Sequence, residues 1–221
     1  MRTLLLMMLF LSTAACAEPV NLITNPGFEN GDGGINGKQK GVAKGWETIC
    51  GGTHPEIYAL DRGVKHSGKY SQRMTCHNYN YCPREDGAYC YHVEDGANVR
   101  HPCSVEIGLQ AIAQTTAPGA VKPECEYAST AWVKIDGLVH SWEWFRISIY
   151  WLDAKKKFIA ETRQDYRTSK NDYGTHDWKL IKITAKSPEN AAFAKVYLHH
   201  HFTEGTVWYD DLTLIELDDS K

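Results

Sequence analysis

Short segments of alternating apolar and polar residues fill most of this chain and constrain its fold more than any other feature. β-Branched and aromatic residues recur at every second position, and clusters of Gly, Pro, Asn and Asp separate the segments. Alternation with a period of two is typical of half-buried β-strands, whereas the helical period of about 3.6 is almost absent. The expected strands are 127–135, 144–152, 178–185, 194–202 and 206–216. We therefore predict an all-β fold, either an antiparallel sandwich or a barrel.

The size and charge of the chain limit its domain count and its partners. A chain of 221 residues with 43% hydrophobic content can bury one core, and all-β domains of this size commonly form one unit. The stretch at about 76–125 is rich in cysteine and lacks alternation, so we expect a loop insertion there. The formal net charge is −3 and the lysines and arginines are scattered. Nucleic acid is therefore not an expected partner.

The N-terminus has the pattern of an export signal. Arg2 precedes an apolar run at 4–11, and the small residues Ala15 and Ala17 follow it. The run is far shorter than the roughly 20 residues that span a bilayer. We predict a signal peptide at 1–17, a secreted mature domain at 18–221 and a monomer. The alternative is a lipid anchor at Cys16 in the cell envelope, because TAAC resembles a bacterial lipobox.

Six cysteines remain once the leader is removed. An even number of cysteines in an exported chain predicts disulfides, although the sequence does not choose among their pairings. Zinc is the weaker alternative, because the spacing C-x5-C-x7-C-x12-C lacks the short C-x2-C pairs of structural zinc sites. The predicted disulfide cysteines are Cys50, Cys76, Cys82, Cys90, Cys103 and Cys125.

Strand alternation sorts the aromatic residues into a core set and an outward set. We expect the core to be formed by mostly apolar residues at alternate positions of three strands. These are the odd positions of 131–135 and 145–151 and the even positions of 194–198. Their neighbours carry flat rings and hydrogen-bonding groups, which suit the C–H faces and hydroxyls of sugars. The predicted ligand-binding residues are Trp132, Trp144, Arg146, Tyr150, Tyr197, His199 and His201.

Several motifs follow one another along nearly the whole mature chain in an order that is typical of one family. They are NLITNPGFENG at 21–31, GW at 45–46, HSGKYSQRM at 66–74, YASTAWVK at 127–134, IYWLDAKKKFI at 149–159, THDWKLIKITAKSP at 175–188 and GTVWYDDLTL at 205–214. These segments resemble carbohydrate-binding modules of the galactose-binding-domain-like jelly-roll superfamily, especially xylan- and glucan-binding modules. The resemblance implies a sandwich of two antiparallel sheets with a cysteine-rich insertion, and structural roles for Trp46, Trp178 and Trp208.

The resemblance also implies a structural calcium ion where the opening turn meets the closing strand. Calcium prefers carboxylate and carbonyl oxygens, and a glycine turn can point several carbonyls inward. Asp211 is preferred to Asp210 as a ligand, because consecutive strand residues point to opposite faces. The implied calcium site consists of Gly27, Glu29, Lys65, Ser67 and Asp211.

The sequence favours binding over catalysis. It contains no G-x-S-x-G elbow, no phosphate-binding glycine loop and no H-E-x-x-H motif. We predict a secreted, non-catalytic module that binds a polysaccharide. The alternatives are a protein-interaction module of the cell surface on the same fold and a glycoside hydrolase or polysaccharide lyase domain.

Overall fold

The structure is a computed structural model of the 221-residue chain. It describes residues 19–50, 57–76, 89–94, 97–102, 109–139, 145–166, 174–201 and 204–217. These residues form strands and turns, with no helix among them and thus none that could span a membrane.

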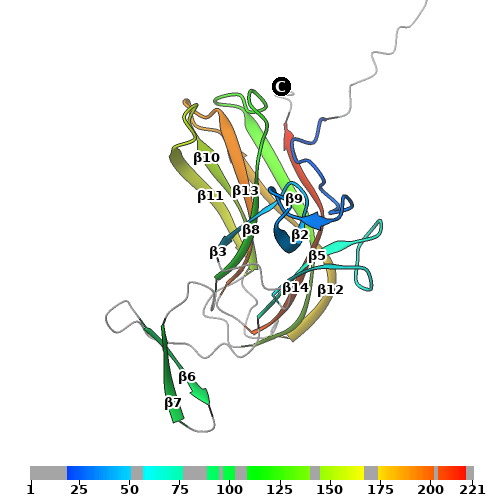
Figure 1. Ribbon diagram of the computed structural model, residues 1–221. Helices are drawn as coiled ribbons and strands as arrows, with labels where there is room; N and C mark the ends of the chain where they lie inside the picture. The colour runs from blue at the N-terminus through cyan, green and yellow to red at the C-terminus, as the bar shows by residue number, and fades with distance from the viewer. Residues whose placement is uncertain are drawn as a thin grey trace, which may run out of the picture.

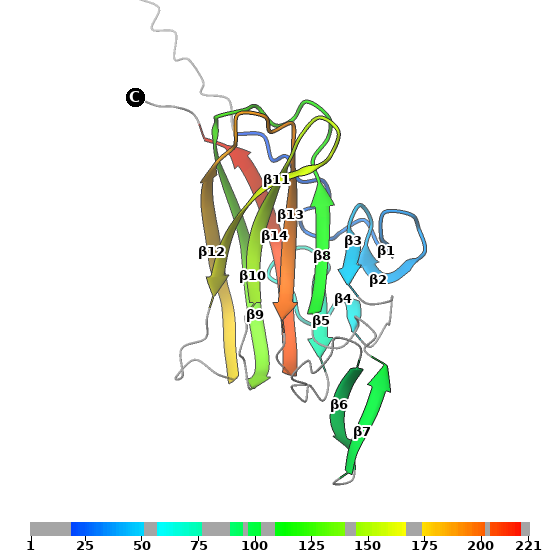
Figure 2. The same ribbon diagram turned by 90° about the vertical axis from the view of Figure 1, so that its left-hand side faces the viewer.

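Two five-stranded sheets pack face to face, as Figures 1 and 2 show. We name each sheet after its central strand. The β13 sheet has the order β11 (Phe158–Tyr166), β10 (Phe145–Leu152), β13 (Phe193–His201), β8 (Leu109–Thr115) and β3 (Glu47–Cys50). The β14 sheet has the order β12 (Gly174–Lys186), β9 (Glu126–Val139), β14 (Glu204–Glu216), β5 (Ser71–Cys76) and β4 (Tyr58–Asp61).

Every strand pair in the described residues is antiparallel. Two further ribbons are present, one of β1 (Asp32–Gly33) with β2 (Gln39–Ala43) and one of β6 (Tyr89–Glu94) with β7 (Ala97–Pro102). The predicted antiparallel sandwich is therefore confirmed.

The five predicted strands correspond to β9, β10, β12, β13 and β14, with ends that differ by a few residues. The predicted insertion at 76–125 is too long at its C-terminal end. Leu109–Thr115 forms β8, which is a strand of the β13 sheet and pairs with β13 on one side and β3 on the other.

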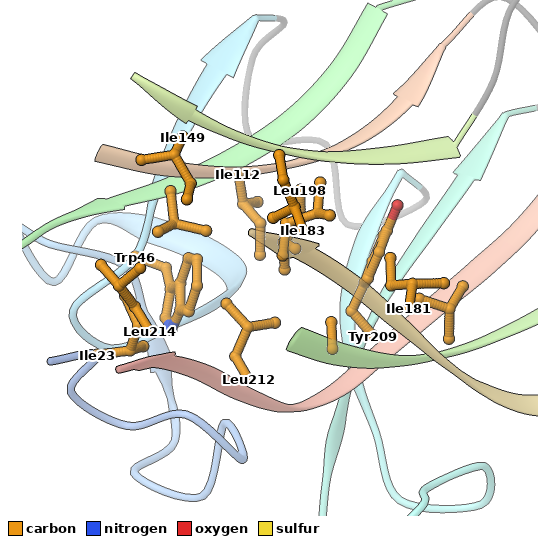
Figure 3. Packing of buried hydrophobic residues seen from close by; sticks show 14 of the residues in the cluster. Ile23, Trp46, Ile112, Ile149, Ile181, Ile183, Leu198, Tyr209, Leu212 and Leu214 are labelled. Atoms are coloured by element: carbon orange, nitrogen blue, oxygen red, sulfur yellow. The ribbon is translucent and has the colours of Figure 1, made fainter. Parts of the chain in front are cut away.

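The core lies between the sheets and follows the predicted alternation. Ala131, Val133 and Ile135 are fully buried on β9, as are Ile147 and Ile149 on β10. Figure 3 shows Ile149, Ile112 and Leu198 from the β13 sheet meeting side chains of the β14 sheet. Strand alternation alone is enough to place the β9 and β10 residues inside.

The first residues of the domain run beside the last strand. The Leu22 amide donates to the Leu214 carbonyl at 2.8 Å, and the Leu212 amide donates to the Pro26 carbonyl at 3.0 Å. Ile23 and Trp46 pack against Leu214 in the core (Figure 3). The two ends of the domain therefore converge, which places the opening turn next to β14.

Candidate functional site

Four of the predicted ligand-binding residues lie together on the outer face of the β13 sheet: Arg146, Tyr150, Tyr197 and His199. Arg146 on β10 stands opposite His199 on β13, and Tyr197 stands two residues before His199 on the same face. Tyr150 on β10 stands opposite Lys195. Because each of these positions alternates with a core residue, their side chains point away from the sandwich interior.

Rings form a continuous row across this face. The ring centroids are 5.3 Å apart for Phe158 and Tyr150, 4.3 Å for Tyr150 and Tyr197, and 5.3 Å for Tyr197 and His199. Exposure falls along the row, from 59% for Phe158 to 8% for Tyr197 and 4% for His199. The accessible end of the row is therefore at Phe158.

Polar groups flank the rings. His199 Nε2 is 3.0 Å from Ser148 Oγ, and Lys195 Nζ reaches across β8 to Glu47 Oε1 at 2.8 Å. Burial, followed by the nearby charge of Glu161, raises the pKa of Tyr150, so its hydroxyl stays protonated and can donate. Glu161 lies opposite Tyr150, and its buried Oε1 has no hydrogen-bond partner in the described part of the chain.

Trp132 does not belong to this face, which corrects the single surface predicted from three strands. It lies on β9 in the other sheet, between Leu180 of β12 and Asp210 of β14. Alternation shows whether a residue points inward or outward, but it does not assign the strand to a sheet. Trp144 lies outside the described residues, and only the backbone of His201 is described, at the end of β13.

A second cluster forms where the loop at 62–70 meets β14. The fully buried Asp210 carboxylate accepts the His66 and Ser67 amides at 2.8 and 3.1 Å. Asp211 accepts the Ser67 hydroxyl at 2.7 Å and lies 2.7 Å from His66 Nδ1. Both aspartates contact the loop instead of pointing to opposite faces, because the register shifts between Asp210 and Thr213 and Asp211 has φ of 47°.

Glu29 brings the opening turn to the same cluster. Its Oε1 accepts the Lys69 and Tyr70 amides at 2.8 and 3.0 Å. Gly68 has φ of +57°, and a Cβ there would collide with the Glu29 carboxylate as it is placed, so both features favour glycine at this position.

Gly27 lies where three carboxylate side chains converge. A Cβ on Gly27 would lie 3.5 Å from Asp211 Oδ1, 3.7 Å from Glu29 Cγ and 3.8 Å from Asp210 Oδ1. Burial raises the pKa of Asp210 to about 6, against the opposing effect of the Ser67 and His66 amides, and neighbouring Asp211 raises it further.

The donors in this cluster suit a hard cation. Among the described residues, no group of three or more His, Cys, Asp or Glu side chains is arranged to hold a metal. Backbone carbonyls complete most calcium sites in proteins. Gly27, Lys65 and Ser67 could supply carbonyls beside the carboxylates of Glu29 and Asp211. The Lys65 ammonium is engaged elsewhere, at 3.0 Å from the Arg62 carbonyl.

The sequence interpretation missed β11 and therefore Phe158 and Glu161. A signal was present, because Asp153 begins a turn in which its Oδ1 accepts the Lys155 and Lys157 amides at 2.8 Å. An Asp-led turn between two apolar segments indicates a hairpin.

The predicted disulfides remain predictions. The structure describes one of the six cysteine side chains, that of the half-buried Cys125 near the start of β9. Cys50, Cys76 and Cys90 lie in β3, β5 and β6 with only their backbone described. Cys82, Cys103 and the leader with Cys16 lie outside the described residues.

No family model matches this chain, and no curated protein matches it in sequence. The fold has many structural neighbours. The enzymatically active domain of tailspike protein 4 from bacteriophage CBA120 matches with a TM-score of 0.54 and 11% identity, over 89% of this chain and 21% of that chain. This chain therefore spans about a fifth of the tailspike domain.

Two further neighbours come from Xyn10C of Paenibacillus barcinonensis. Its CBM22-1 xylan-binding domain has a TM-score of 0.51 and 10% identity, over 91% of this chain and 97% of that domain. The tandem of CBM22-1 and CBM22-2 has a TM-score of 0.50 and 11% identity, over 94% of this chain and 49% of the tandem. The fold is therefore the jelly-roll sandwich of carbohydrate-binding modules, as predicted.

Proposed function

We propose that this protein is a non-catalytic carbohydrate-binding module that holds a polysaccharide against the outer face of the β13 sheet. The observation that carries the proposal is the ring row from Phe158 through Tyr150 to Tyr197. The fold shared with a xylan-binding domain across nearly its full length supports the same conclusion.

The chemistry of the face suits a sugar chain. Axial C–H bonds of a pyranose pack against aromatic rings, and its hydroxyls need donors and acceptors at the sides. The Glu161 side chain lies beside Tyr150 and is 22% exposed, so part of its carboxylate faces solvent. A sugar hydroxyl stacked near Tyr150 would donate to this exposed part of the carboxylate.

The carboxylates that the structure describes on this face, Glu161 and Glu47, do not form a hydrolytic pair. Glycoside hydrolysis needs two carboxyl groups within about 10 Å of each other. Glu161 and Glu47 lie on β11 and β3, at opposite edges of the sheet. Four strand spacings separate these edges by about 19 Å. Glu47 is also paired with Lys195. These features favour binding without cleavage.

We further propose that calcium stabilises the junction of the opening turn with β14. Glu29 and Asp211 would supply carboxylate oxygens, and Gly27, Lys65 and Ser67 would supply carbonyls. The convergence of Asp210, Asp211 and Glu29 around Gly27 supports this proposal. The ion would offset the repulsion between these carboxylates and hold the loop at 62–70 against the opening turn.

The proposed setting is extracellular, with the leader at 1–17 removed. Acylation of Cys16, which would tether the module to the cell envelope, is the alternative. Mass spectrometry of the mature N-terminus distinguishes the two, because a lipid adds mass to Cys16 and simple cleavage removes that residue.

Affinity electrophoresis of the mature protein in gels that contain xylan, mixed-linkage glucan or galactan tests the binding proposal. We expect retardation by at least one neutral polysaccharide and its loss in Tyr150→Ala. The control Leu180→Ala removes an exposed side chain from the outer face of the other sheet and should leave retardation unchanged. Equal mobility in all gels, or equal effects of both variants, would refute the proposed face.

A further inference from the structure

A basic pocket lies away from the ring row, beside the junction of the opening turn and the loop at 62–70. It has a volume of about 650 Å³ and is lined at its charged positions by Arg62, Lys65, Lys69 and Glu29, with Tyr70 beside them. Sites for small ligands commonly enclose about 300–1,000 Å³. The loop connects β4 to β5, on the side of the molecule opposite the β10–β11 hairpin in Figure 1.

Two of the three cations are held in place by the loop itself. The Arg62 guanidinium lies over the Tyr70 ring, 5.0 Å from its centroid, and donates to the Tyr70 hydroxyl. The Lys65 ammonium donates to the Arg62 carbonyl at 3.0 Å. Side chains that are already positioned lose less conformational entropy when a ligand binds.

The charge of the pocket is positive, although the net charge of the chain is −3. Glu29 is the one carboxylate in the lining, and its Oε1 accepts the amides of Lys69 and Tyr70. Lys69 has no ion-pair partner in the described ranges of the chain. Three cations around one engaged carboxylate favour an anionic ligand.

We propose that this pocket binds the carboxylate of a uronic acid residue, so that the module recognises an acidic polysaccharide at a site separate from its ring row. The inference rests on the proposed carbohydrate-binding function and extends it to a charged class of glycan. Arg62 and Lys69 would donate to the carboxylate, and Lys65 would add to the positive potential. The Tyr70 ring, half-buried and backed by Arg62, would contact the apolar side of the sugar.

Isothermal titration of the mature protein with oligogalacturonate, and in parallel with neutral xylo-oligosaccharide of the same length, tests the proposal. We expect oligogalacturonate to bind and its affinity to fall as ionic strength rises. Lys69→Gln should lower that affinity about threefold to tenfold and leave neutral binding unchanged. The control Lys179→Gln removes the same charge from an exposed lysine of β12 and should change neither affinity.

The failures of this inference and of the proposed function are distinguishable. Absence of oligogalacturonate binding, while neutral binding persists and depends on Tyr150, would overturn the inference alone. Equal losses of oligogalacturonate affinity in Lys69→Gln and Lys179→Gln would also overturn it, because they would indicate non-specific electrostatic attraction to the protein surface. Inorganic sulfate or phosphate that binds as tightly as the uronate oligomer would overturn the assignment to a sugar acid. A third outcome is oligogalacturonate binding that depends on Lys69, with no binding of neutral oligosaccharide. It would support the proposed uronate site in the pocket and refute the proposed binding of a neutral polysaccharide to the ring row.

Discussion

The imidazole of His66 lies flat against the indole of Trp132, with ring centroids 3.9 Å apart and planes 14° apart. Trp178 meets the same imidazole edge-on at 5.7 Å, and Asp211 Oδ2 lies 2.7 Å from its Nδ1. This contact fastens the loop at 62–70 to the outer face of the β14 sheet. Trp132 is therefore an anchor for the loop, and one of its faces is already covered.

Replacement of Trp132 by alanine should lower stability and spare binding. We expect Trp132→Ala to reduce the free energy of unfolding by about 2 kcal/mol, because a half-buried indole and its stacking contact are lost. Urea unfolding measures this change, and titration with a neutral glycan measures binding. A variant of unchanged stability that no longer binds would instead assign Trp132 to the sugar site.

The sequence predicted the interior of the sandwich well because strand alternation is a local property. Ala131, Val133 and Ile135 were assigned to the core from their period alone, and all three are fully buried. The same period could not reveal that β9 and β10 belong to different sheets. That arrangement depends on long-range strand pairing, which separated Trp132 from Tyr150.

The carboxylate cluster was only partly predictable for a different reason. The motifs at both ends of the domain placed Glu29 and Asp211 near each other, and the structure brings both to the loop at 62–70. Strand alternation favoured Asp211 over Asp210, but a bulge at Asp211 turns both carboxylates toward the loop. A bulge inserts one residue without a distinct sequence signal, so alternation fails beyond it.

Phe158 should contribute to glycan binding without contributing to stability. Its ring is 59% exposed and stands at the accessible end of the row. We expect Phe158→Ala to weaken binding of a neutral polysaccharide about threefold to tenfold, which corresponds to the loss of one stacking contact. Its melting temperature should stay within about 2 °C of the wild type, because surface substitutions usually change stability little. Unchanged affinity would show that the sugar does not reach β11.

Calcium should raise the stability of the protein through Glu29 and Asp211. A ligand present at about 100 times its dissociation constant adds about 2.7 kcal/mol, which corresponds to roughly 5–10 °C for a domain of this size. We expect calcium to raise the melting temperature of the chelated wild type by this amount and to have little effect on Glu29→Gln or Asp211→Asn. Asp177→Asn is the matched control, because Asp177 is exposed and pairs with Lys134 on the outer face. A melting temperature that does not respond to calcium would show that the ion does not bind at this site.

Asp210 should make the metal-free protein less stable as the pH rises. The folded-state pKa of Asp210 is about 6 and its ordinary value is 3.8, so the folded protein binds more protons between these values. Stability then falls with increasing pH across about pH 4 to 6, by up to about 3 kcal/mol in total, and changes little above that range. The asparagine of Asp210→Asn cannot ionise. The difference in free energy of unfolding between wild type and this variant should therefore change by up to about 3 kcal/mol between about pH 4 and 6.

Calcium should remove the pH dependence of stability that Asp210 causes in chelated samples. A bound cation favours ionised carboxylates, so calcium should abolish the loss of wild-type stability between pH 4 and 6. Urea unfolding of wild type and Asp210→Asn at pH 4.5 and 6.5, each with chelator and with calcium, measures all four differences. A stability difference between the two proteins that is independent of pH in chelator would show that Asp210 ionises as readily in the folded chain as in the unfolded one. The hydrogen bonds from the His66 and Ser67 amides would then fully compensate the burial of its charge.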